Sequence, residues 1–228
     1  MNGGLAPFAN PAWWLAGAHL AEVVSLEDPQ HRGRVQVQLH GPDPKGDAAV
    51  WARVAVPFAG NNYGAFLLPD VGEEVLVVFA GADARHPVVV GALWTGAHDL
   101  PEELSAKQVD RWTLTGKNGT RIAIVEKAKG KEQVVIETPG GATATLSDAD
   151  GGEISLVVGG NSLTMDSAGI AIEAGGEFSV QASTIRLEAG SMTVTAAAAD
   201  FSGATSSASL RTGSVISASY SPGAGNIW

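Results

Sequence analysis

Pairs of apolar side chains separated by one polar residue recur through the C-terminal third of this chain. Side chains at i and i+2 share one face of a strand, so each pair predicts a strand of roughly five or six residues. A strand this short buries too little surface to offset its own ordering entropy, so we expect a long β-structured rod built from several chains. The pairs recur roughly every 7 to 8 residues and are Ile154/Leu156, Leu163/Met165, Ile170/Ile172, Phe178/Val180, Ile185/Leu187 and Met192/Val194.

A different pattern precedes Leu100, where strands alternate with longer and more varied loops. Val35, Val37 and Leu39 alternate with polar residues, which is typical of a strand with one buried face. Residues 20–26, 33–39, 50–56, 74–79 and 87–93 are the predicted strands. Five strands in so short a segment predict a small closed barrel of the OB type, and therefore an all-β fold.

Residues 100–109 are polar and lack a strand pattern, so they mark a boundary between two parts of the chain. After them, Asn118-Gly119 lies between two apolar runs and predicts a hairpin. We therefore expect an N-terminal segment at 1–16, a barrel domain at 17–99, a linker at 100–110 and a hairpin and repeat region at 111–228.

Charge and composition narrow the range of functions. The net charge is −10, and residues 1–100 contain ten acidic against five basic side chains, which argues against a nucleic-acid partner. The absence of cysteine excludes disulfides and thiolate metal sites. No apolar run is long enough for a transmembrane helix, and the N-terminus lacks the basic residues of a signal peptide.

Candidate catalytic groups are sparse in the sequence. The acidic pairs Glu73-Glu74 and Glu102-Glu103 are sequence neighbours, and neighbouring side chains on a strand point to opposite faces. No Gly-x-Ser-x-Gly motif is present, and the loop after His40 is better explained as a turn than as a metal site. We expect no enzymatic activity, no metal and no cofactor.

Three segments carry a resemblance to a known family. Residues 51–69, which contain Gly60-Asn61-Asn62-Tyr63-Gly64, and residues 71–79 and 83–94 resemble the central spikes of contractile tails, known as phage baseplate assembly protein V or VgrG. The resemblance implies a homotrimer whose OB domains form a collar and whose chains intertwine as a triple-stranded β-helix. It also implies a structural, non-enzymatic spike that punctures a cell for a contractile phage tail or a related injection system.

The resemblance assigns roles to three sets of residues. The apolar pairs named above would point to the trimer axis. Phe8, Trp13 and Trp14 would contact a separate baseplate hub protein, and Asn226, Ile227 and Trp228 would contact a PAAR-type tip protein. The spike would be assembled in the bacterial cytoplasm, reside in the baseplate of a virion or injection particle, and touch the target cell envelope transiently.

Two alternatives remain open from the sequence. A monomeric β-solenoid adhesin or carbohydrate-binding module attached to an OB barrel would also contain short-strand repeats. A tail lysozyme is the other alternative, although no cleft domain fits between the barrel and the hairpin at Asn118. Trp13 and Trp14 could also fill the barrel core instead of an interface.

Overall fold

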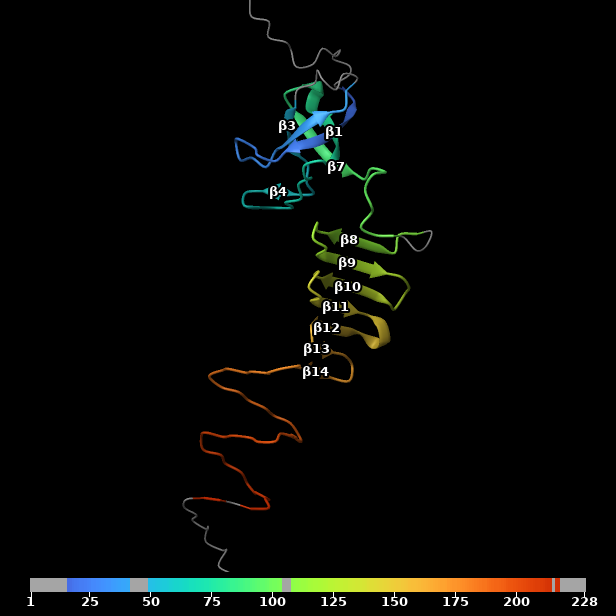
Figure 1. Ribbon diagram of the computed structural model, residues 1–228. Helices are drawn as coiled ribbons and strands as arrows, with labels where there is room; N and C mark the ends of the chain where they lie inside the picture. The colour runs from blue at the N-terminus through green and yellow to red at the C-terminus, as the bar shows by residue number, and fades with distance from the viewer. Residues whose placement is uncertain (1–15, 42–48, 104–107, 215, 218–228) are drawn as a thin grey trace, which may run out of the picture. The chain divides into compact units, whose positions relative to one another are not determined.

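The computed structural model describes residues 16–41, 49–103, 108–214 and 216–217 (Figure 1). Within these residues the regular structure consists of β-strands and two short 3₁₀ turns, with no α-helix and therefore no helix that could cross a membrane. The chain divides into two compact units, one up to Gly176 and one from Glu177 onward. The first unit contains a closed barrel and a seven-stranded sheet.

The barrel confirms the predicted five-stranded, OB-like fold. Its strands follow each other around the barrel in the order β1-β2-β3-β7-β6. They are β1 (Ala18–Ser25), β2 (Val35–Leu39), β3 (Val50–Val54), β6 (Glu74–Phe79) and β7 (Pro87–Leu93). A further short hairpin, β4 (Ala59–Gly60) with β5 (Tyr63–Gly64), lies between β3 and β6 and was not predicted.

Alternating side chains fill the barrel. Val35, Val37 and Leu39 of β2 point inward, as do Val75, Val77 and Phe79 of β6, and all are at most 5% exposed. The polar or half-exposed residues between them face outward, which is the period-two pattern of a strand buried on one side. The register shifts once between β1 and β2 and once between β6 and β7, and such bulges help a small barrel to bend closed.

The two ends of the barrel carry different segments of the chain. β3 and β7 are parallel, and both run antiparallel to their other neighbours in the barrel. The C-terminal ends of β1, β3 and β7 therefore lie at one end, which we call the exit end because the chain leaves it after Leu93. The start of β1 at Ala18 and the connection from β2 to β3 lie at the opposite end.

The sheet is an antiparallel meander in which each strand pairs with the next along the chain. Its strands are β8 (Arg111–Thr115), β9 (Arg121–Glu126), β10 (Glu132–Glu137), β11 (Thr143–Ser147), β12 (Glu153–Val158), β13 (Asn161–Met165) and β14 (Ile170–Glu173). The predicted hairpin at Asn118-Gly119 is confirmed, since Gly119 has a φ of 86° and donates its N–H to the Gly116 carbonyl.

A buried carboxylate fixes the turn between β1 and β2. Asp28 accepts hydrogen bonds from the backbone N–H groups of Gln30 and Arg32, and its Oδ1 lies 2.6 Å from the Arg34 guanidinium. The guanidinium also lies 5.7 Å from the ring centroid of Trp51. The Arg34 hydrogen bond holds the pKa of Asp28 well below its usual range.

We expect Asp28→Asn to lower the melting temperature of the barrel at pH 7 and to flatten its pH dependence. Because the pKa of Asp28 is lower in the folded state than in the unfolded state, its contribution is present above about pH 4 and is lost as the pH falls below that. Thermal melting at pH 7 and pH 3 measures the difference. Glu27→Gln changes the exposed neighbouring residue and is the control. Its melting temperatures at pH 7 and pH 3 should equal those of the unmodified protein.

Candidate trimer interface

Fourteen side chains, two from each strand, form a single face of the seven-stranded sheet. Paired residues on adjacent strands share a face, so the register assigns each side chain to one side. Two columns run across the strands on this side, which we call the apolar face. The first column is Trp112, Ile124, Val134, Leu146, Ile154, Met165 and Ile170, and the second is Leu114, Ile122, Ile136, Ala144, Leu156, Leu163 and Ile172.

The apolar face is open to solvent in the single chain. Trp112 is 54% exposed, Leu114 is 61% exposed and Ile170 is 70% exposed, and eight other members exceed a third. The opposite face carries mainly Thr, Ser, Ala and charged side chains, yet Ala123 and Val125 on it are buried. A continuous exposed apolar face of this extent is typical of a protein–protein interface.

Six of the predicted axis residues lie together on this face: Ile154, Leu156, Leu163, Met165, Ile170 and Ile172. The other eight members, from Trp112 to Leu146, were missed. They show the same i, i+2 spacing, but loops of five residues separate their strands, so their pairs recur at intervals of ten to twelve residues and fall outside the shorter repeat of the C-terminal third. The structure also differs from the expectation that neighbouring strands come from other chains, because β8 to β14 pair within one chain.

The last three predicted pairs behave differently. Phe178, Val180, Ile185, Leu187, Met192 and Val194 belong to the second unit, where the described residues 177–214 contain no strand. Figure 1 draws these residues as an orange to red trace that runs back and forth. Phe178 is 62% exposed and Leu187 is 72% exposed. In one chain alone these segments have neither a strand partner nor a surface that covers their apolar side chains.

A charged cluster ties the linker to the polar face of the sheet. The Glu102 carboxylate lies 2.6 Å from Nε of Arg121 and 3.3 Å from the Arg111 guanidinium, and Asp110 also pairs with Arg111. The Arg121 hydrogen bond lowers the pKa of Glu102 despite its partial burial. Both arginines form ion pairs with Glu102. Its pKa is therefore lowered, whereas a general acid requires a raised pKa.

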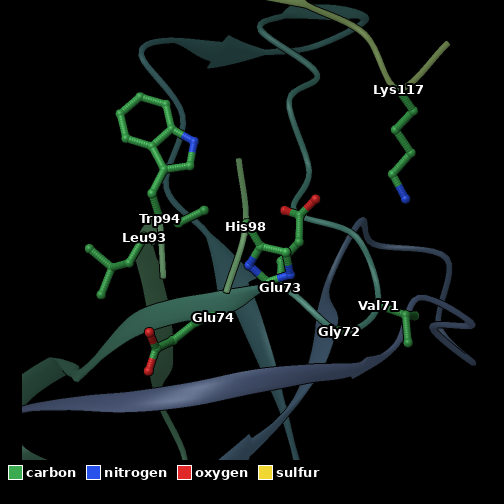
Figure 2. A pocket seen from close by; sticks show the side chains of 9 residues that line it. Val71, Gly72, Glu73, Glu74, Leu93, Trp94, His98 and Lys117 are labelled. Carbon is green, nitrogen blue, oxygen red and sulfur yellow. The ribbon is translucent and has the colours of Figure 1, made fainter. Parts of the chain in front are cut away.

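A shallow pocket lies at the exit end of the barrel, and Figure 2 shows its lining. Val71, Leu93 and Trp94 supply its apolar side chains, and Glu73 and Glu74 lie beside them. The two carboxylates point in different directions in Figure 2, and Glu74 lies 3.5 Å from the His40 imidazole. This pair therefore lacks the opposed arrangement of carboxylates that glycoside hydrolysis uses.

The remaining predicted site residues lie outside the described part of the chain. These are Phe8, Trp13 and Trp14 at the N-terminus and Asn226, Ile227 and Trp228 at the C-terminus. Within the described ranges, no three His, Asp or Glu side chains gather in a group that could hold a metal ion.

Two family models match this chain, one over the barrel and one over the repeat region. Residues 19–94 match the type VI secretion system and phage-baseplate injector OB domain, and residues 133–200 match the phage baseplate V C-terminal trimerisation domain. The first match covers the barrel. The second begins in β10 and continues beyond the sheet into the second unit, so it covers both the paired and the unpaired repeats.

Similar curated proteins are spike proteins of bacteria. The type VI secretion system spike protein VgrG4b of Pseudomonas aeruginosa is 39% identical over 111 residues, which are 46% of this chain and 14% of the relative. VgrG1c of the same organism is 31% identical over 113 residues, 46% of this chain and 16% of the relative. The actin cross-linking toxin VgrG1 of Vibrio cholerae is 29% identical over 39% of this chain and 8% of its own length. The matched region thus spans less than a fifth of each relative.

Proposed function

Since the chain belongs to the VgrG-like family of baseplate spike proteins, we propose that it forms a homotrimeric, non-enzymatic needle that punctures a target cell. The apolar face of the sheet is the observation that supports this proposal most directly. Three copies that turn this face inward would enclose a common core about the axis. Each half-exposed side chain would then gain about 1 kcal/mol from the burial of its remaining surface.

The second unit supports the same assembly. Its extended segments would complete their backbone hydrogen bonds with strands from two other chains, as an intertwined triple-stranded β-helix requires. A β-solenoid of one chain would instead pair its own coils, and the described residues 177–214 contain no such pairing. Phe178, Val180, Ile185, Leu187, Met192 and Val194 would then continue the core that the apolar face begins.

We assign the proposed partners to opposite ends of the chain. Phe8, Trp13 and Trp14 precede β1, which starts at the barrel end opposite the exit end, and would contact a baseplate hub. Asn226, Ile227 and Trp228 would contact a PAAR-type tip. Once contraction drives the needle forward, a rod with its backbone groups paired between chains would transmit axial load to the tip without local unfolding.

Light scattering on the purified protein tests the homotrimer. We expect a mass three times the 23.3 kDa of one chain, independent of concentration in the micromolar range. The trimer should also survive at temperatures that melt the barrel, because its core spans three chains. A particle of 23.3 kDa would refute the spike and favour a monomeric adhesin or binding module.

A further inference from the structure

A hairpin at the exit end of the barrel exposes an unusual number of large apolar side chains. It comprises residues 57–68, which contain β4 and β5, and we call it the aromatic hairpin. Phe58 is 59% exposed, Tyr63 is 68% exposed and Phe66 is 81% exposed, and Leu67 is also exposed. Figure 1 shows β4 in a loop that extends away from the barrel strands.

The aromatic hairpin has a defined shape of its own. β4 pairs with β5, and Ala65 donates its N–H to the Phe58 carbonyl over 3.0 Å. The Tyr63 ring covers Gly60 so closely that a Cβ there would overlap it. Because these contacts order the backbone before any partner arrives, the loss of conformational entropy on docking is small.

The chemistry of this segment suits burial against another protein. Residues 54–69 contain no charged side chain, in a chain where charged residues make up 17%. Covering the aromatic hairpin would therefore remove apolar surface from water without desolvating a charge of the hairpin itself. An exposed aromatic cluster is also the kind of anchor that dominates binding energy at protein interfaces.

A second exposed apolar patch lies on other strands at the same end of the barrel. It consists of Val71, Leu93 and Trp94, which are 54%, 41% and 74% exposed, and we call it the barrel-end patch. Figure 2 shows Trp94 next to Leu93. Val71 precedes β6, and Leu93 ends β7, whereas the aromatic hairpin follows β3.

We propose that the aromatic hairpin of one chain docks on the barrel-end patch of the next chain, so that three barrels close into a ring. This inference rests on the proposed homotrimer. A contact about a three-fold axis is head-to-tail, so it requires two different complementary surfaces on the same barrel. The trimerisation region would hold the three barrels close together, which makes the docking effectively intramolecular. The aromatic hairpin is thus a second trimer contact, independent of the apolar face.

Paired cysteines test this contact, because the chain has no cysteine of its own. Phe66→Cys and Trp94→Cys are combined in one chain, and the purified protein is treated with a mild oxidant or a short bis-maleimide. We expect covalent dimers and trimers on a denaturing gel, and the oxidised species should return to monomers on reduction. Phe58→Cys with Trp94→Cys is a second pair at the same proposed interface.

Matched variants separate this contact from other arrangements. Each single-cysteine variant should stay monomeric on the gel, as should Phe66→Cys with Arg85→Cys, because the loop that holds Arg85 lies at the opposite barrel end. Suppose that light scattering gives three times 23.3 kDa, but neither cysteine pair forms links or the controls link equally well. The contact is then wrong, and the homotrimer stands. A mass of 23.3 kDa for the unmodified chain overturns the homotrimer itself.

Discussion

Ile172→Asp is expected to convert the trimer into single chains at pH 7. Ile172 is 54% exposed in one chain and belongs to the apolar face, so in the proposed trimer it would lie near two copies of itself. Each replaced side chain forfeits about 1 to 2 kcal/mol of burial. The larger loss comes from three carboxylates brought together in a poorly solvated core. Light scattering should report a fall from three times 23.3 kDa to 23.3 kDa.

Ala171→Asp is the matched control, because Ala171 is the preceding residue on β14 and faces the other side of the sheet. It adds the same charge and should leave the trimer intact. Lowering the pH toward 4 should restore part of the assembly of Ile172→Asp, since protonation removes the repulsion. If Ile172→Asp stayed trimeric with an unchanged melting temperature, an inward position for this side chain would be wrong.

Removal of residues 1–16 should abolish incorporation of the spike into assembled tails and leave a folded trimer. This segment precedes β1 and contains Phe8, Trp13 and Trp14, while the chain leaves the barrel for the sheet at the opposite end. A hub that holds the end distal to the needle would therefore meet this segment first. Light scattering and electron microscopy of tails assembled with the truncated protein give the two readouts.

A variant in which residues 1–16 are replaced by a Gly/Ser segment of equal length controls for the loss of length. It should fail to assemble in the same way, because the proposed contact depends on the aromatic side chains. If either variant were still incorporated, the hub would bind another surface of the spike. Trp13 and Trp14 would then have the alternative role of filling the barrel core.

The barrel was predictable because its strands alternate strongly. Val35, Val37 and Leu39 mark one buried face without ambiguity, and the structure buries all three. β4 and β5 escaped prediction for the opposite reason. Each is two residues long and contains a glycine, so neither shows a periodicity of apolar side chains.

The apolar face was predicted only in part. The short spacing from Ile154 onward identified its later members, whereas five-residue loops between Trp112 and Leu146 give a longer period that this repeat did not include. Spacing alone also could not separate strands that pair within the chain from those that do not. Ile170/Ile172 and Phe178/Val180 look alike in sequence, yet only the former lies in a strand.

The end of strand pairing within the chain after β14 sets an order of steps for assembly of the proposed trimer. The meander from β8 to β14 consists of contacts between sequence neighbours, so its strand pairing is local and closes no long loop. The described residues 177–214 contain no strand pairing within the chain, so in the proposed trimer their pairing would need other chains and would be bimolecular or higher in order. Assembly should then proceed as a zipper that starts at the sheet and closes toward the C-terminus, with a rate that rises with protein concentration.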